Sequence, residues 1–569
     1  MSRGEFCREL RERLMAAQEK LLLRVVMAPN FEQPHEFSGM GLVSRAEEMA
    51  ESVVLPRARS VVLLLLPHSP ELFLLQLGLV LKGHIPAILA WPTTRIEPEK
   101  YQRNLIHQLS HLPADSLLTL SQLAKNLAGS LPYAAAGVKL ENEATFERLF
   151  PARAVSERLE AREFSQQHTE TGDDTLFLQF SGGTTGSQKA IVVTAEMLVK
   201  QLGQLQEALR FRAEDGVASW LPLYHDMGLI ASYWMPLWHG AASVQIGASD
   251  WIINPELLLN VVEKYSATFC WLPNFAFAYL SQRREAMKDV HDLKSVRAWN
   301  NCSEPVRQKS LEQFASAFED SGVRRENLQS SYAMAETVFA ISQSTLGREL
   351  AKFPRASVCA GYQAYSGLSF DLIDEVYLSS GKPLRDVELR IVATDGSECG
   401  EAVPGEIHVR TPALFGGYWG STGFQTHTLR EGWHATGDYG FLADGELFVI
   451  GRLKDIVIVG GNNIYPEDVE SVVNTLDGVY PGRVVAFGVE DQEYGTQSLA
   501  VVAEAKLQLG DEAAVELEVA IRKLVLTSIG TAPRYVAVVP QRWIVKSTAG
   551  KISRKETRDR YLRERLSVD

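Results

Sequence analysis

Residues 60–91 read SVVLLLLPHSPELFLLQLGLVLKGHIPAILAW and contain a strand–helix–strand pattern. The apolar run 60–66 predicts a buried strand, and residues 70–82 predict a helix that Gly83 is placed to end. Residues 85–91 predict the next strand. Such a unit joins two parallel strands through a helix that covers the sheet, so it indicates an α/β fold.

The same alternation of strands and helices recurs further along the chain. Residues 176–180 predict a strand before a glycine-rich loop, and residues 267–272 and 296–300 predict further short strands. We therefore expect a large N-terminal domain of parallel-type sheets flanked by helices. From about residue 381, short apolar runs alternate with turn residues and predict a β-rich subdomain.

The two ends of the chain differ from this body. We place a domain boundary near residues 452–456, which separates an N-terminal core of residues 1–451 from a small α+β domain of residues 452–569. Residues 6–26 mix Arg and Glu with Leu and Val at helical spacing. They predict one amphipathic helix that covers the body, a membrane-surface helix being the alternative.

Charge and cysteine usage narrow the class of protein. The 569 residues include 57 Lys and Arg against 70 Asp and Glu, a net charge of −13 that disfavours a nucleic-acid partner. Five scattered cysteines without CxxC spacing argue against a disulfide framework or a zinc site and fit a reducing cytoplasm. We see no signal peptide, and polar residues interrupt the most apolar stretch, so we expect a cytoplasmic protein without an integral membrane segment.

Residues 178–189, LQFSGGTTGSQK, carry the strongest chemical signal. Three glycines allow backbone N–H groups to converge on an anion, and hydroxyl side chains and Lys189 add donors and charge. The P-loop of kinases and GTPases does not fit, because Lys189 neither follows the last glycine directly nor precedes Ser or Thr. Taken alone, the loop predicts phosphate binding only slightly better than a flexible surface turn.

Ten segments in order, this loop among them, resemble the signature set of the adenylate-forming superfamily. That superfamily includes acyl-CoA synthetases, fatty acyl-AMP ligases, luciferases and the adenylation domains of peptide synthetases. The segments are FSGGTTGSQK (180–189), WLPLYHDMG (220–228), NCSEPVR (301–307), SYAMAE (331–336), GE (405–406), GYW (417–419), TGD (436–438), GRLKD (451–455), NIYPEDVE (463–470) and KSTAGK (546–551). The resemblance covers roughly residues 60 to 555 and implies that a carboxylic acid attacks the α-phosphate of ATP to form an acyl-adenylate and pyrophosphate.

The resemblance implies roles for named residues. The phosphates of ATP would be held by Ser181, Gly182, Gly183, Thr184, Thr185, Gly186 and Lys189. Mg²⁺ would be bound by Glu336 with Thr184, and Thr337 would contact the α-phosphate. The nucleoside would be held by Tyr332 against adenine, by Ser303, Glu304 and Pro305 in the purine pocket, and by Asp438 on the ribose with Arg452 nearby. Without the motif series, Glu336 reads as an N-cap carboxylate and Asp438 as a turn residue.

Lys551 is our predicted catalyst, again by resemblance. An ammonium group can bridge the substrate carboxylate and the α-phosphate and stabilise the charge of the transition state. The alternative is a solvated basic tail that includes Lys546, Arg554 and Lys555. Because Lys551 and the phosphate loop lie in different domains, domain motion is implied, and Lys454 occupies the hinge position of the family.

The acid and the acceptor are less defined. His225 matches the family histidine beside the acyl carboxylate, a packed core histidine being the alternative. Adenylation domains that activate α-amino acids normally carry aspartate at this position, so we favour a plain carboxylic acid as the substrate. Asp226 follows directly, so an amino-acid-activating enzyme is the alternative. A longer segment between Glu336 and Gly381 resembles the insertion of fatty acyl-AMP ligases and favours an acyl or peptidyl carrier protein as acceptor. CoA is the alternative, favoured by Lys189, and an inactive nucleotide-binding scaffold is a further one.

Overall fold

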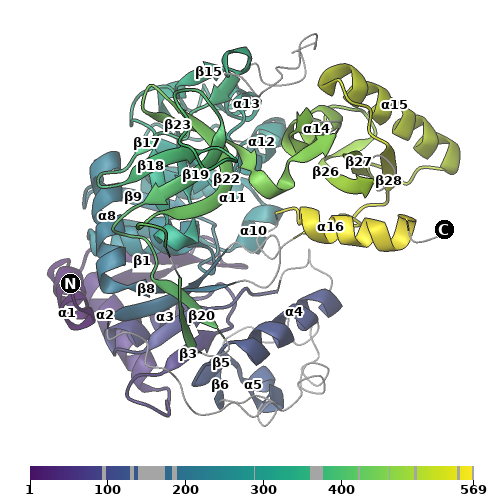
Figure 1. The fold of residues 1–569 in the computed structure, drawn as a ribbon. Coiled ribbons are helices and arrows are strands. Elements are labelled where there is room, and N and C mark those ends of the chain that lie inside the picture. Colours follow the sequence, from purple (N-terminus) through teal and green to yellow (C-terminus); the bar gives the residue numbers. More distant parts are fainter. Residues whose placement is uncertain are drawn as a thin grey trace.

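The computed structural model describes residues 1–92, 98–127, 134–138, 174–181, 189–287, 289–358, 376–420, 423–427, 429–459, 462–491, 496–546 and 551–566. Within these ranges, two large sheets flanked by helices form the N-terminal body, and the last elements gather at one side of it (Figure 1). The predicted α/β class with parallel-type sheets is confirmed. The domain boundary near residue 452 stays a prediction.

The first sheet has nine strands among the residues described. Their order is β17 (Lys382–Pro383), β14 (Ala340–Gln343), β13 (Leu328–Ala333), β12 (Ala298–Asn301), β11 (Phe269–Leu272), β9 (Gly216–Ser219), β10 (Ala242–Ile246), β1 (Leu21–Val26) and β2 (His35–Ser38). The strands from β13 to β1 pair in parallel, and the strands at both edges pair antiparallel. The carboxyl ends of the parallel strands therefore meet at one edge, where α/β folds place ligands.

The second sheet contains the strand–helix–strand unit predicted from residues 60–91. Its eight described strands run in the order β21 (Gly423–Thr426), β20 (Gly417–Gly420), β8 (Ala190–Thr194), β7 (Thr175–Phe180), β4 (Ile85–Ile88), β3 (Val61–Leu64), β5 (Ser116–Leu120) and β6 (Ala134–Val138). Helix α3 (Pro70–Leu81) joins β3 to β4, and Gly83 follows with φ of 85°, so the left-handed residue predicted to end this helix is present.

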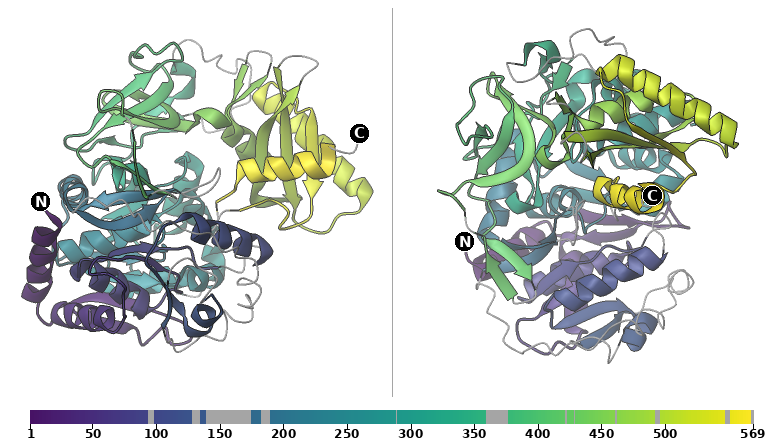
Figure 2. Two further views of the ribbon diagram at one scale, coloured as in Figure 1. Left: turned by 60° about the horizontal axis from the view of Figure 1, so that its bottom comes forward. Right: turned by 45° about the vertical axis from the view of Figure 1, so that its right-hand side comes forward.

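The helices of the body lie against these sheets, and the views of Figure 2 show them on both sides. They are α2 (Gly39–Glu51), α4 (Pro98–His111), α5 (Ser121–Leu127), α8 (Ala195–Leu209), η1 (Met227–Trp234), α9 (Met235–Trp238), α10 (Ala248–Ile253), α11 (Glu256–Tyr265), α12 (Asn274–Arg283) and α13 (Gln308–Ala317). Of the helices that the structure describes, none has both the length and the apolar composition to cross a membrane.

The prediction of one helix over residues 6–26 is wrong. Helix α1 (Arg3–Ala16) ends early, Gln18 takes a left-handed φ of 47°, and Leu21–Val26 forms β1. Strand β1 pairs in parallel with β10, and four of its six side chains are buried. The run of Leu and Val residues is stabilised more by burial and pairing in the large sheet than it would be by packing as a helix. This is a tertiary effect that local spacing does not report.

Smaller sheets follow the body. Four described strands form the β-rich part in the order β18 (Glu388–Val392), β19 (Gly405–Arg410), β22 (His434–Ala443) and β23 (Glu446–Arg452), and β15 (Lys352–Pro354) pairs with β16 (Val376–Leu378). The C-terminal part contains β24 (Val457–Val459), β25 (Asn462–Ile464), α14 (Pro466–Val473), β26 (Val479–Asp491), β27 (Thr496–Ala505), α15 (Asp511–Ile529), β28 (Tyr535–Val539) and α16 (Arg554–Tyr561). Two of its buried clusters draw all their residues from position 457 onward.

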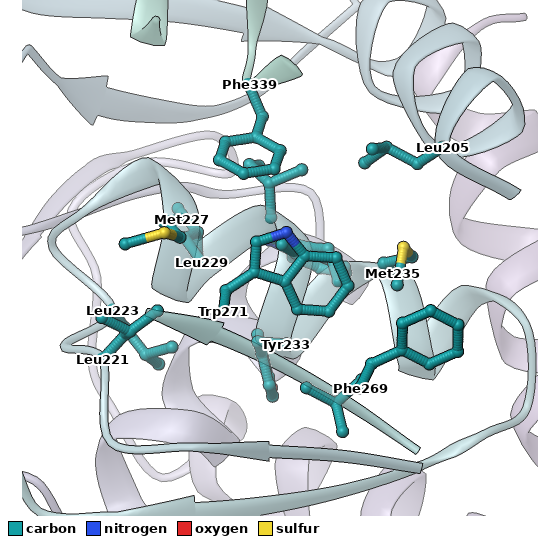
Figure 3. Packing of buried hydrophobic residues seen from close by; sticks show 14 of the residues in the cluster. Leu205, Leu221, Leu223, Met227, Leu229, Tyr233, Met235, Phe269, Trp271 and Phe339 are labelled. Carbon is teal, nitrogen blue, oxygen red and sulfur yellow. The ribbon is translucent and has the colours of Figure 1, made fainter. Parts of the chain in front are cut away.

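The main core fixes the loops at the edge of the first sheet. Trp271 of β11 is fully buried, and Figure 3 shows its indole ring between Tyr233 of η1 and Phe339, with Met227 nearby. Met227 directly follows the HD pair at 225–226, and Phe339 lies three residues after Glu336. The same packed core therefore anchors two segments that the sequence assigned to the site.

Candidate functional site

One cavity of about 1880 Å³ collects most of the residues predicted from the sequence. It lies where the body meets the C-terminal part and is lined by side chains from both. The predicted site residues in its wall are Ser181, Lys189, His225, Ser303, Glu304, Pro305, Tyr332, Glu336, Asp438, Arg452, Lys454 and Lys551. Residues separated by up to 370 positions thus face one space, which is what a single site for several substrates requires.

The remaining predicted residues take two other places. Gly182, Gly183, Thr184, Thr185 and Gly186 lie outside the described residues. The two ends of their loop are joined, because Ser181 N donates to Lys189 O at 2.9 Å and Lys189 N donates to Ser181 Oγ at 3.2 Å. Thr337 is buried beside the cavity, and its hydroxyl donates at 3.0 Å to the carbonyl groups of Met334 and Phe339.

Asp438 and Tyr332 form a hydrogen-bonded pair in the cavity wall. The Tyr332 hydroxyl donates to Asp438 Oδ2 at 2.5 Å, and Arg452 Nε lies 3.4 Å from Asp438 Oδ1. Asp438 and Arg452 face each other because β22 and β23 pair in that register. Burial raises the pKa of Asp438, whereas the Arg452 charge and the Tyr332 hydroxyl oppose that rise. One carboxylate oxygen is thus held by a phenol and the other by a guanidinium.

Glu336 lies on the short helical turn Ala335–Thr337 at the end of β13. Burial raises the pKa of Glu336, and the nearby Asp226 adds to the rise. The Tyr418 hydroxyl donates to Glu336 Oε1 at 3.4 Å, and Lys189 Nζ lies 4.5 Å from the centre of the Tyr418 ring. We call this group, with His427 and His434 beside it, the Lys189 end of the cavity.

Two residues beside the site hold backbone conformations that side chains disfavour. Ser303 has φ of 73° and Val338 has φ of 68°, the latter a rare value for a β-branched residue. The Val338 carbonyl accepts a hydrogen bond of 2.9 Å from Gln179 Nε2, which is buried next to the glycine-rich loop. Such strain persists only where surrounding packing enforces it, and it concentrates at functional sites.

His225 and Asp226 occupy the wall below Ser303. His225 Nδ1 lies 2.5 Å from Asp226 Oδ1, and Asp226 also accepts a hydrogen bond of 2.8 Å from Met227 N at the start of η1. Burial would raise the pKa of Asp226, but His225 and Lys551 together hold it below its usual value. The charge of Lys551, which belongs to the C-terminal part, therefore acts on Asp226 of the body.

Lys551 reaches the body from the C-terminal part. Its Nζ donates to the carbonyl oxygen of Ser303 at 3.0 Å. Three residues later, the half-buried Arg554 binds Asp455 at 2.7 Å, Glu467 at 3.2 Å and Glu470 at 2.9 Å. This network ties the start of α16 to α14 and to the turn that carries Lys454. It therefore holds in place the backbone that follows Lys551.

A buried ion-pair cluster joins the same C-terminal elements to the body. Asp468 of α14 has a side chain 3% exposed, and it lies 2.9 Å from Arg355 Nη1 and 3.4 Å from Arg307 Nη1. These two arginines hold the pKa of Asp468 below its usual value despite burial. The sequence places Arg307 and Asp468 in two of the motifs, but nothing in it pairs them, so this contact was missed.

The hinge residue predicted from the sequence is also at the junction. Lys454 lies on the turn Leu453–Asp455, directly after β23, and its side chain is exposed at the cavity. Partial burial lowers the pKa of Lys454, and the neighbouring Arg452 adds to this effect.

Comparison with known proteins agrees with this geometry. The family model for AMP-binding enzymes matches residues 42–419. The ligase Rv1013 of Mycobacterium tuberculosis is 30% identical over 404 residues, which cover 67% of this chain and 71% of that protein. The medium-chain-fatty-acid–acyl-carrier-protein ligase JamA of Moorena producens is 28% identical over 412 residues, which cover 70% of this chain and 69% of JamA. A solved structure from work on the fatty acyl-adenylate ligases of E. coli and L. pneumophila superposes with a TM-score of 0.78 at 21% identity and covers 98% of both chains.

Proposed function

The chain belongs to the family of AMP-binding enzymes, and from this premise we propose that it activates a fatty or related carboxylic acid and passes the acyl group to a carrier-protein thiol. As an adenylate-forming ligase it uses ATP to convert an acid to an acyl-adenylate. The observation that carries the proposal is the reach of Lys551 into the cavity that Tyr332, Glu336 and Asp438 line. A cation from one part of the chain meets nucleotide-binding groups from the other.

In this proposal the nucleoside lies along the first sheet. Asp438 accepts hydrogen bonds from the ribose hydroxyls, with Arg452 beside it. Tyr332 packs on adenine, and Ser303, Glu304 and Pro305 form the purine pocket. Ser181 and Lys189 hold the phosphates together with Gly182, Gly183, Thr184, Thr185 and Gly186, and Thr337 lies next to the α-phosphate.

Lys551 supplies the charge for adenylation. The substrate carboxylate and the α-phosphate are both anions, so their approach is unfavourable until a cation lies between them. The ammonium of Lys551 now donates to the Ser303 carbonyl, and in the reacting complex it would donate to these two oxygens instead. Lys551 therefore interacts more strongly with the transition state than with its partner in the free enzyme, and this difference lowers the barrier.

Glu336 suits a magnesium ion. Its carboxylate is a hard oxygen ligand, it faces the cavity, and burial raises its pKa, so a cation beside it would restore the charged form. We assign Mg²⁺ to Glu336, with Thr184 as the second ligand. When bound, the ion neutralises phosphate charge.

The substrate acid would lie beside His225. We favour a plain carboxylic acid because His225 stands where amino-acid-activating enzymes carry aspartate. Asp226 is engaged with His225 and with Met227 N, so it is less able to bind a substrate ammonium group.

The acceptor is assigned from the relatives. JamA is named for transfer to an acyl carrier protein, and it matches this chain over 70% of its length. The segment between Glu336 and Gly381 that resembles the insertion of fatty acyl-AMP ligases includes residues 359–375, which lie outside the described residues. Lys454 serves as the hinge about which residues 452–569 turn, in our proposal, between adenylation and thiol transfer.

Two measurements test the proposal. Acid-dependent exchange of labelled pyrophosphate into ATP should be fastest with fatty acids in a panel of fatty, aryl and amino acids. Purified acyl-adenylate complex should then acylate a phosphopantetheinylated carrier protein much faster than CoA. Rapid formation of acyl-CoA would reject the carrier protein as acceptor, and exchange with amino acids alone would reject the acid.

A further inference from the structure

Two histidines at the Lys189 end of the cavity have no role in the assignments above. His427 follows β21 and His434 opens β22, and both line the cavity. His427 Nε2 lies 3.3 Å from His434 Nδ1, a distance that allows one ring to donate a hydrogen bond to the other. The two imidazoles thus form one unit.

The position of His427 is set by the strand that leaves the glycine-rich loop. Strand β8 begins directly after Lys189, and β20 pairs with it through Trp419 and Ala190. Strands β20 and β21 form a hairpin, and His427 follows it directly. The backbone N of His427 donates to Gly416 O at 3.0 Å. The imidazole is therefore fixed relative to Lys189 by strand pairing.

Aromatic contacts hold the ring itself. The imidazole of His427 stacks on Phe415, with 4.9 Å between centroids and 26° between planes. It also makes a T-shaped contact with Tyr418, with centroids 5.9 Å apart, and Lys189 Nζ lies 4.5 Å from the centre of the Tyr418 ring. His427, Tyr418 and Lys189 form one packed group.

The charged neighbours of the two histidines include one cation, Lys189, whose charge acts on both rings. Lys189 is the cation, and Glu336 is the acid that reaches it through Tyr418. Beyond His434, His408 pairs with Glu406 at 3.3 Å. Burial lowers the pKa of His427, and burial lowers that of His434 to about 4, with Lys189 adding to both effects. A polyanion would reverse this by supplying the missing countercharge.

We propose that His427, supported by His434, is a further phosphate-binding residue that donates a hydrogen bond to the terminal phosphates of ATP and to released pyrophosphate. The inference rests on the proposed function, because it takes the Lys189 end as the site of the phosphates. Binding draws one proton from solvent onto His427, and His434 Nδ1 or a phosphate oxygen accepts from the ring. No covalent bond changes in this step.

The test uses magnesium pyrophosphate and MgATP as probes of the full-length protein. Isothermal titration at pH 7.5, a value roughly one unit above the ordinary imidazole pKa, would compare wild type with His427→Gln. We expect pyrophosphate to bind about 10-fold more weakly, since a hydrogen bond to a charged group is lost. Titration in buffers of different ionisation enthalpy should show proton uptake in wild type and none in the variant.

Two further variants make the result specific. His408→Gln is the same change on the neighbouring β19, outside the cavity wall, and it should bind both ligands as wild type does. His427→Lys restores a cation and should recover pyrophosphate affinity to within about threefold, even if His427→Gln proves poorly folded.

The outcomes separate this inference from the proposed function. If wild type binds neither ATP nor pyrophosphate, the proposed function fails. If wild type binds both, and His427→Gln and His427→Lys bind pyrophosphate with unchanged affinity and proton uptake, the role of His427 fails alone. A loss shared equally by His408→Gln would also reject it, because the effect would then be one of folding.

Discussion

The contact between α14 and the body allows a quantitative prediction. Among the described residues, Arg307 and Arg355 converge on the carboxylate of Asp468, with distances of 3.4 and 2.9 Å. Asp468→Asn keeps the size of the side chain and removes its charge. The two guanidinium groups, 19% and 11% exposed, would then face a neutral amide.

The cost follows from this burial. Removing one partner of a buried ion pair costs about 3 to 5 kcal/mol, and loss of a carboxylate in the first turn of a helix costs about 0.3 to 1 kcal/mol more. Both arginines retain some exposure to water, so we take the low end, about 3 kcal/mol. Since 1.4 kcal/mol is a factor of about 10, the contact that holds α14 to the body weakens by roughly 100-fold.

Because α14 is tied through Arg554 to the segment of Lys551, loss of this contact should withdraw Lys551 from Ser303. We expect pyrophosphate exchange to fall by up to about 100-fold, while ATP affinity changes little because Tyr332 and Asp438 belong to the body. Asp477→Asn is the matched control, because it makes the same change in a fully exposed carboxylate whose ion pair, with Lys506 at 3.4 Å, lies at the surface. Exchange by Asp468→Asn within twofold of Asp477→Asn would refute the reasoning.

Four further outcomes are expected. Lys551→Ala should slow acyl-adenylate formation in single turnovers by at least about 100-fold with little change in ATP affinity, whereas Lys523→Ala on the exposed face of α15 should not. Glu336→Gln should raise the Mg²⁺ concentration for half-maximal activity about 10-fold, and unchanged Mg²⁺ dependence would exclude it as a ligand. Asp438→Asn should raise KM for ATP about 10-fold and leave KM for the acid unchanged. Burial lowers the pKa of His239 from 6.5 to about 4, so between these pH values the folded state binds fewer protons than the unfolded state and loses stability as pH falls. In denaturant titrations, His239→Gln should lose less stability over this pH range than wild type, by at most about 3 kcal/mol.

Local sequence was sufficient for several elements of the body. Buried strands such as β3 and β11 are apolar throughout, and Gly83 marks the end of α3, so each can be predicted from neighbours in the chain. The same reasoning failed at β1, because a run of Leu and Val beside charged residues fits a helix until the partner strand β10 is known. Strand pairing across more than two hundred residues is not encoded in spacing.

For the site too, the sequence located some residues and missed others. Motifs located the residues that line the cavity, since the order of the motifs carries information that no single one has. They did not locate the partners of Asp468, because an ion pair between α14 and two arginines depends on how the parts pack. His427 and His434 were missed for a related reason: His427 follows β21 and His434 opens β22, and sequence spacing does not show that their ring nitrogens lie 3.3 Å apart.

The present partner of Lys551 has a consequence for catalysis. A neutral carbonyl holds its ammonium group, so the contact is weaker than one with an anion would be and is readily given up. Asp226 lies close enough for its charge to act on Lys551, yet His225 and Met227 N occupy the Asp226 carboxylate. Within the described ranges, Lys551 is thus held in the cavity by a carbonyl contact and forms no ion pair. In the reaction that we propose, the strongest attraction for this cation forms only when the acid and the α-phosphate approach each other, and an interaction that strengthens on the way to the transition state accelerates the reaction.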